Sequence, residues 1–426
     1  MKNLQLKQNG RFYYGWVITL LGFLLMTFAY VGCVSLTSIF VLPVTEDLGL
    51  ERGAFMTYVT LLSLACIVVS PFAGKAMQKK NPKIVVAIGC VMGFLGYLGF
   101  SQSSSLTAFY LFSLILGVCF AMTAPAPVSI MINSWFGGKV RGTATGIAFI
   151  GSGIGGAILS PILNTVIQHF GWRVGYVVLG CVFLVILLPL TLLLYVKRPE
   201  DKGFTRMGEL SGEAAVAPGD GEVSHPGLDL KQALRTPELW LAALSAVFVV
   251  FASSAILAND VSFYVECGMD STRAASIHGI MLGSMVIGKP LMGMLIDKLG
   301  IKIGSTISTF IFAAVFVSLS SLPVLPALVY AVVVTYCLGA PSITIVPPLT
   351  VNGLFGEKDY GTIVGVMNTA TSIGGAFGGM IAARVYDATG SYVTFWVIAA
   401  VFVVVSALIR LLAFRLNQKR NTWSAV

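Results

Sequence analysis

The sequence predicts an all-α integral membrane protein with twelve transmembrane helices in two pseudo-symmetric six-helix bundles. Three observations support this prediction: the composition, the number of long apolar stretches, and a repeat that relates the two halves of the chain. Of the 426 residues, 56% are hydrophobic and only 11% are charged, whereas an ordinary soluble domain has about 25% charged residues. The composition therefore argues against a soluble fold.

Twelve stretches of the chain have the length and composition of a membrane span, which requires about 20 apolar residues. Backbone polar groups find no partners in hydrocarbon, so runs of this length are predicted to be helices rather than barrel strands. The predicted spans of the first half are 15–42, 54–74, 83–101, 106–134, 142–168 and 174–196, and those of the second half are 238–265, 274–296, 301–320, 325–352, 361–387 and 392–414.

The net charge of +9 is distributed unevenly between the two sides of the predicted membrane domain. If successive loops alternate sides, 22 of the 27 Lys and Arg residues lie on the side of the two termini. Only Arg52, Arg173, Arg273 and Arg384 lie on the other side, and Lys289 lies within a span. This is the positive-inside pattern. It predicts that both termini of this cell-membrane protein lie on the cytoplasmic side. The basic balance thus indicates orientation, and no nucleic-acid partner is expected.

A polar segment rich in Gly and Pro separates the two halves at residues 197–236. It is too long for a tight turn, and its composition is typical of a flexible linker. We therefore predict an N-terminal bundle at 1–196, a cytoplasmic linker at 197–236 and a C-terminal bundle at 237–426.

A constant offset of 219 residues relates the two predicted bundles, which indicates duplication of a six-helix unit. The glycine-rich run Gly151-Ser-Gly-Ile-Gly155-Gly156 in the span 142–168 also suggests close helix packing, since a position without a side chain lets two backbones approach. The matching segments are Asn133-x-x-Phe136-Gly137 with Asn352-x-x-Phe355-Gly356, Gly142-Thr143 with Gly361-Thr362, and Ile154-Gly155-Gly156-Ala157 with Ile373-Gly374-Gly375-Ala376.

A short polar loop stands between the second and third spans of each half. In the second half it contains Gly293, Asp297, Lys298 and Lys302, in the order Gly-x-x-x-Asp-Lys-x-Gly-x-Lys. The first half has a weaker copy, in which Gly74 is kept and Gln78 replaces the aspartate.

This pattern resembles the signature loop of the major facilitator superfamily of secondary transporters. The resemblance covers the whole chain. It implies alternating access around a site near the membrane midplane, between two parallel six-helix repeats. It also implies that the carboxylate of Asp297 forms an ion-pair cluster with Lys298 and Lys302 that locks the outward-open state. Gln78 carries no charge, so we expect a weaker lock in the first half.

Lys289 is the clearest candidate for a substrate-binding residue, because charge inside a span is costly and usually functional. It lies eight residues before Asp297, or about 12 Å from the cytoplasmic end of the span. One hypothesis is a cationic anchor for a carboxylate, and the alternative is a structural lysine bonded to carbonyls freed by Pro290. Asn368 lies at comparable depth in span eleven. Its amide suits either a substrate oxygen or a bond between helices.

Asp260 and His278 are candidates for proton coupling or for an outer gate. Asp260 lies near the outer end of span seven, and His278 lies about one turn into span eight from the same side. The ordinary pKa of histidine suits proton transfer near neutral pH. The alternatives are a solvated acid at a helix end and an interfacial histidine.

A cation eight residues before the signature aspartate is also similar to the arginine of span eight in oxalate/formate antiporters and related monocarboxylate carriers. The segments Tyr14-Gly-Trp-Val17 and Arg198-Pro-Glu-Asp-Lys-Gly203 resemble bacterial members of that group. This sequence departs from that group in two ways. Lysine replaces the arginine, so the bidentate geometry of a guanidinium is lost. Oxalate carriers also have a second cation in span eleven, and residues 361–383 contain none. A single fixed charge favours a monoanion over a dicarboxylate.

The sequence therefore predicts a secondary carrier of small organic anions, such as monocarboxylates, acting by proton symport or anion exchange. We expect it to function as a monomer in the lipid bilayer without a cofactor or metal. The alternatives are an efflux carrier driven by proton antiport, an integral-membrane enzyme and a carrier-like sensor. An efflux pump for cations has no need of a buried lysine. The three histidines are widely separated, and no nucleophile with a nearby base supports an enzyme.

Overall fold

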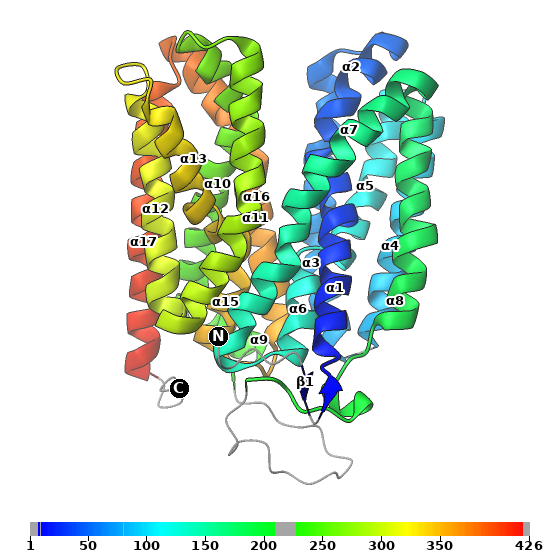
Figure 1. Cartoon of the computed structure of the whole chain (residues 1–426), viewed down its shortest axis with the longest axis vertical. Coiled ribbons are helices and arrows are strands. Elements are labelled where there is room, and N and C mark those ends of the chain that lie inside the picture. Colours follow the sequence, from blue (N-terminus) through cyan, green and yellow to red (C-terminus); the bar gives the residue numbers. More distant parts are fainter. Residues whose placement is uncertain (1–6, 9, 80, 209–226, 421–426) are drawn as a thin grey trace. The chain divides into compact units, whose positions relative to one another are not determined.

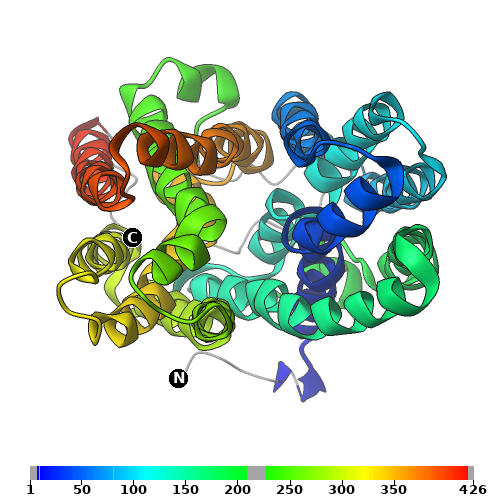
Figure 2. The same ribbon diagram turned by 90° about the horizontal axis from the view of Figure 1, so that it is seen from above.

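The structure, a computed structural model, describes residues 7–8, 10–79, 81–208 and 227–420. By their contacts the residues divide into two compact units, Met1–Glu209 and Leu210–Val426. Each unit is a bundle of long helices, seen from the side in Figure 1 and mostly end on in Figure 2. The division lies inside the predicted linker 197–236, of which 209–226 are outside the described residues. The predicted limits of the bundles and of the linker stay a prediction.

The first unit begins with a short antiparallel hairpin, followed by helices that include two π-helical segments. The hairpin strands are β1 (Lys7–Gln8) and β2 (Arg11–Phe12). The helices are α1 (Gly15–Leu25), η1 (Met26–Ser35), α2 (Thr37–Leu48), α3 (Arg52–Lys79), α4 (Pro82–Gln102), α5 (Leu106–Thr123), α6 (Ala126–Trp135), η2 (Gly138–Val140), α7 (Arg141–Cys181), η3 (Val182–Leu187), α8 (Leu188–Leu194) and η4 (Pro199–Lys202).

The second unit consists of helices α9 to α17. They are α9 (Leu230–Leu234), α10 (Pro237–Glu266), α11 (Ser271–Leu299), α12 (Ile301–Ser321), α13 (Leu328–Gly339), α14 (Pro341–Thr344), α15 (Val346–Phe355), α16 (Tyr360–Thr389) and α17 (Val393–Arg420).

All twelve predicted spans fall on these helices, and the all-α membrane fold is confirmed. Among the described residues, nine helices are long and apolar enough to cross a membrane, or ten if one bent pair counts as a span. The pair is Leu328–Thr344 and Val346–Phe355, bent by 48° just before Pro347, whose ring lacks the backbone donor of a regular helix. α16 has the length of a span, is rich in Gly, Ala and Thr, and stands outside the nine.

One of the nine, Arg141–Leu194, is 54 residues long. It contains the predicted span 142–168 and all but the last two residues of the predicted span 174–196. The chain leaves the helical conformation at Gly171, where φ is 83° and ψ is 164°. This conformation is easily adopted only by glycine. Gly171 therefore ends the fifth span and starts the sixth.

The first predicted span, 15–42, is less regular than the sequence suggested. It consists of α1, the π-helical η1 and the start of α2, with an interruption at Leu36. Hydrophobicity alone predicts a span and cannot distinguish a π-helix from an α-helix, because both bury the same apolar side chains.

The two units repeat the same order of helix packing, as expected from the duplicated sequence. In the first unit, α3 and α4 pack on α5, and α1 with η1 packs on α7. In the second unit, α11 and α12 pack on α13, and α10 packs on α16.

Paired glycines allow the closest of these contacts. A Cβ on Gly155 would lie 2.6 Å from the carbonyl oxygen of Thr27, and a Cβ on Gly374 would lie 2.4 Å from that of Val247. These distances are too short for any side chain. The packing role predicted for the glycine-rich run of the first half is therefore confirmed at Gly155, and Gly374 has the same role in the second half.

The repeated Asn-x-x-Phe-Gly segments each hold one described end of the chain between the bundles. In the first unit, Gly137 N donates to Met207 O at 2.8 Å, and Met207 N donates to Trp135 O at 3.1 Å. In the second unit, Leu228 N donates to Phe355 O at 2.9 Å. Each end of the connection is thus fastened to its own unit by backbone hydrogen bonds.

Candidate substrate and proton-coupling site

Lys289 lies deep inside the second unit, on α11. Its residue surface is only 2% exposed. The preceding Gly288 lets α11 approach α13, because a Cβ there would lie 1.7 Å from the carbonyl oxygen of Cys337. The backbones of α11 and α13 are therefore in close contact next to Lys289. The burial expected of Lys289 is present, and its role as an anion anchor stays a prediction.

Asn368 lies on α16 and is 8% exposed. The first turn of this helix is anchored at Asp359, whose Oδ1 accepts a hydrogen bond from the Thr362 hydroxyl at 2.8 Å. Asn368 is a buried amide two turns further along the helix. Its predicted contact with a substrate oxygen is not tested by this position.

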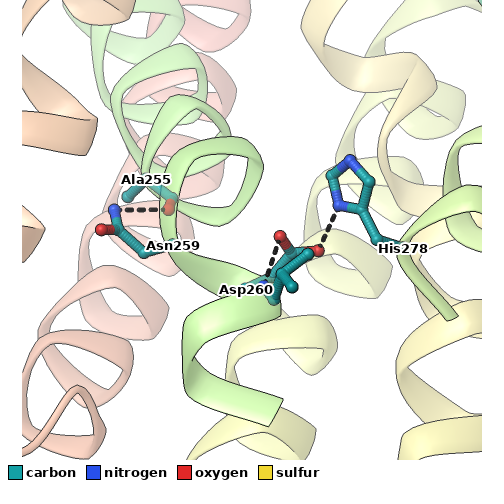
Figure 3. Close-up of polar contacts among 5 residues, drawn as sticks. Ala255, Asn259, Asp260 and His278 are labelled. Atoms are coloured by element: carbon teal, nitrogen blue, oxygen red, sulfur yellow. Dashed lines mark hydrogen bonds and ion pairs between the residues drawn. The ribbon is translucent and has the colours of Figure 1, made fainter. Parts of the chain in front are cut away.

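The structure joins Asp260 of α10 and His278 of α11 in one pair (Figure 3). Asp260 Oδ2 lies 2.7 Å from His278 Nδ1, a distance typical of a charge-assisted hydrogen bond. The other carboxylate oxygen, Oδ1, accepts from the backbone N–H of Val261 at 2.9 Å. The Asp260 side chain is 1% exposed and that of His278 is 24% exposed. The alternative of a solvated helix-end acid is therefore wrong for Asp260, since α11 covers it.

Asn259, which the sequence analysis did not select, connects this pair to the rest of the unit. Its amide nitrogen donates to Ala255 O at 3.0 Å and to Gly379 O at 3.2 Å, and its oxygen accepts from the Tyr392 hydroxyl at 3.4 Å. At Asn259, one residue before Asp260, α10 is thus hydrogen-bonded to α16 and to Tyr392, which precedes α17. Its neighbouring aspartate was the only signal in the sequence.

Lys289 and His278 lie on the same helix, eleven residues apart. At 1.5 Å per residue they are separated by about 16 Å along α11. One helix therefore carries both a buried cation and one member of a buried carboxylate–imidazole pair. A displacement of this helix would act on both groups together.

The signature loop of the second unit is a tight reversal between α11 and α12. Gly300 is the only residue between them and has a φ of 79°, which favours glycine. Gly293 is buried and Asp297 is half-buried. Lys302, expected to pair with Asp297, donates from Nζ to Gln418 Oε1 at 3.0 Å.

The loop of the first unit uses a different helix start. Asn81 precedes α4, and its side chain accepts a hydrogen bond from Lys83 N at 3.1 Å. Gln78 receives a hydrogen bond on its backbone oxygen from Lys197 Nζ at 3.1 Å. Gly74 is buried. The locking roles predicted for both loops stay predictions.

Arg410 on α17 is a buried charge that the sequence analysis missed. It is 4% exposed, and its guanidinium donates to Ser245 Oγ at 3.1 Å, to Ser305 O at 3.4 Å and to Ser406 Oγ at 3.4 Å. Its position inside the predicted span 392–414 could have revealed it. It was instead counted among the cytoplasmic cations because it lies near the end of that span.

In the first unit, Asp47 at the end of α2 pairs with Arg173, whose Nη1 lies 2.7 Å from Asp47 Oδ2. The hydrogen bond from Arg173, followed by that from Trp172, lowers the pKa of Asp47 below its ordinary value. Both side chains are about half exposed, so the pair contributes little to stability. Its geometry fixes the end of α2 against the start of the sixth span.

These helices and their comparison with known proteins define a multi-pass membrane carrier rather than an enzyme. Residues 19–353 and 266–424 match the Major Facilitator Superfamily, and the chain belongs to this superfamily. The resemblance of the signature loop is thereby confirmed.

Relatives with known names support the same class. Over 432 residues the chain is 24% identical to "Monocarboxylate transporter 12" of Homo sapiens, covering 96% of this chain and 82% of the relative. Over 352 residues it is 23% identical to "Oxalate:formate antiporter" of Oxalobacter formigenes, covering 80% and 78%. The crystal structure of the superfamily transporter FucP, in the outward conformation, matches with a TM-score of 0.65 at 14% identity, covering 95% of this chain and 98% of FucP. This last match shows the fold.

Proposed function

We propose that this protein is a secondary carrier of small organic monoanions, chiefly monocarboxylates, that works by alternating access. The observation that carries the proposal is the burial of Lys289, which is 2% exposed within a membrane span. A charge in that environment is expensive to maintain and usually serves a function. An ammonium group is a compact point charge, so it suits one carboxylate of a small substrate.

Proton symport is the favoured coupling, because the Asp260–His278 pair between α10 and α11 offers a buried proton-binding site, and α11 also carries Lys289. A proton taken up there would offset the negative charge that the substrate brings to Lys289. Anion exchange remains the second candidate, and the relative named as an oxalate:formate antiporter favours it. The two modes differ in whether a pH gradient alone drives accumulation.

The test uses purified protein in proteoliposomes with radiolabelled formate, lactate, pyruvate and oxalate. We expect uptake of the monocarboxylates, stimulated by a pH gradient that is acidic outside, and much weaker uptake of oxalate. Protein-free liposomes give the background. Export of cationic amphiphiles without any transport of organic anions would support the efflux alternative and contradict the proposal.

The proposed location is the plasma membrane, with both termini on the cytoplasmic side and one chain as the functional unit. The opposite sides of the membrane can be compared at two exposed positions of the first unit, Glu200 on η4 and Ser104 between α4 and α5. Both are on the surface, so a difference in labelling reports on side rather than on burial.

In intact cells, Ser104→Cys should react with an impermeant thiol reagent and Glu200→Cys should not, in a background with the accessible native cysteines replaced. After the cells are opened, both should react equally. Labelling of Glu200→Cys from outside would reverse the proposed orientation. Labelling of Ser104→Cys in intact cells serves as the positive control.

A further inference from the structure

Arg410 has no acidic partner among the residues that the structure describes. Its three hydrogen bonds go to Ser245 Oγ, Ser305 O and Ser406 Oγ, all of them neutral acceptors. The two serine hydroxyls also bond each other, at 2.8 Å. A buried guanidinium is always charged, and its desolvation is normally compensated by a counter-charge. It also has five N–H donors, of which these bonds occupy three.

Beside Arg410 lies a small pocket that contains two more buried donors. Ser342 and Thr350 line the same pocket as Arg410, and they are 2% and 3% exposed. Within the described part of the chain, neither hydroxyl has a hydrogen-bond partner. A buried hydroxyl without a partner loses its bonds to water without replacement, which is costly. Three polar groups able to donate therefore meet around one small space.

Apart from Ser245, the rest of the lining is apolar and includes Val249, Val346 and Pro347. The lining residues come from α10, α14, α15, α16 and α17, and none comes from α11. The pocket is consequently separate from Lys289. It has room for about one occupant of the size of a water molecule or halide ion.

We propose that this pocket binds a small inorganic monoanion, with chloride as the ligand, between the guanidinium of Arg410 and the hydroxyls of Ser342 and Thr350. Charge and hydrogen-bonding capacity both favour an anion, because every polar group named can donate to it. A water molecule would satisfy the hydroxyls and leave the guanidinium charge uncompensated.

The position of the pocket indicates access from the ends of α10 and α15 that border the connection between the bundles. Ser245 lies eight residues from Pro237 at the start of α10, about 12 Å along the axis, and Thr350 lies five residues before Phe355 at the end of α15. An ion bound there would link α17 to α14 and α15. It would stabilise the packing of those helices.

The test measures thermal unfolding of the purified full-length protein in chloride and in gluconate at constant ionic strength. We expect a saturable increase in the melting temperature with chloride. Thr350→Val keeps the shape of the side chain and removes one donor. It should raise the half-saturating chloride concentration by about tenfold, the size expected for a lost hydrogen bond to a charged group. Ser342→Ala should act in the same direction.

Two controls make the assignment specific. Thr123→Val removes a fully buried hydroxyl of the first unit, one that donates to Cys119 O at 2.8 Å, and it should leave the chloride response at the wild-type value. Lys289→Gln should also retain the response, because that residue lies outside the pocket. Equal melting temperatures in chloride and gluconate would overturn the proposal. Unchanged chloride affinity in Thr350→Val, or loss of the response in Lys289→Gln, would overturn it as well, and neither outcome decides whether monocarboxylates are transported.

Discussion

Replacing Lys289 with glutamine is expected to remove most binding of the transported monocarboxylate. Losing one partner of a desolvated charge pair costs about 2–5 kcal/mol, which corresponds to a decrease in affinity of about 30-fold or more. Lys289→Arg should retain part of the affinity because the charge survives. Its larger planar group must fit beside a backbone contact that excludes even a Cβ at Gly288, so full affinity is not expected.

The measurement is substrate-induced thermal stabilisation of the purified wild type and variants. Arg273→Gln is the matched control, since it removes an exposed cation from the same helix and should leave binding at the wild-type level. Glutamine at position 289 keeps the length of most of the side chain, so a cavity does not explain a loss of binding. Equal substrate affinity in the wild type and Lys289→Gln would reject the anion anchor and favour the structural role beside Pro290.

Replacing Asp260 with asparagine is expected to uncouple transport from the proton gradient. A gradient of one pH unit stores about 1.4 kcal/mol per proton, enough for about tenfold accumulation by a carrier that moves one proton per substrate. Without the carboxylate that accumulation should fall to about one, while exchange of labelled for unlabelled substrate continues. Asp260→Asn is a cleaner change than His278→Gln, because the second variant leaves the buried carboxylate without its imidazole partner, which is costly.

Accumulation and exchange are measured in the same proteoliposomes, so that folding and insertion are controlled within one preparation. Asp270→Asn removes an exposed acid from the turn before α11 and should keep the accumulation of the wild type. Continued accumulation driven by the pH gradient in Asp260→Asn would rule out the pair as the coupling site. Loss of both activities would assign Asp260 a structural role in the packing of α10 against α11.

The positions of the spans were predictable because bilayer thickness and backbone hydrogen bonding leave few possibilities for long apolar stretches. The glycine-rich run of the fifth span predicted the close approach at Gly155, and the shared packing order of the two units agrees with the duplication that the repeat indicated. The π-helical part of the first span was not predictable, because it changes the backbone and leaves the apolar pattern intact. At Gly171 the sequence predicted part of the result. The predicted spans 142–168 and 174–196 placed a turn between them, whereas the backbone conformation of Gly171 is known only from the structure.

The site was predicted in part, and its failures have physical causes. Asp260 and His278 were each selected for their charge and depth, yet their 2.7 Å contact depends on how α10 and α11 rotate against each other. Arg410 was missed because an arginine near the end of a span looks like any cytoplasmic cation. Only the tertiary structure shows that α10 and α12 cover it.

The anchored ends of the inter-bundle connection have a practical meaning for anyone altering the chain. Met207 and Leu228 are each held by a backbone hydrogen bond to the Phe-Gly segment of their own unit. A change in the length of the chain between them is therefore expected to leave the packing of both bundles unchanged. Lengthening such a connection costs little, about 0.6 kcal/mol of closure entropy for each doubling. The stretch between residues 209 and 226 is therefore the natural place to insert an affinity tag or a fluorescent reporter.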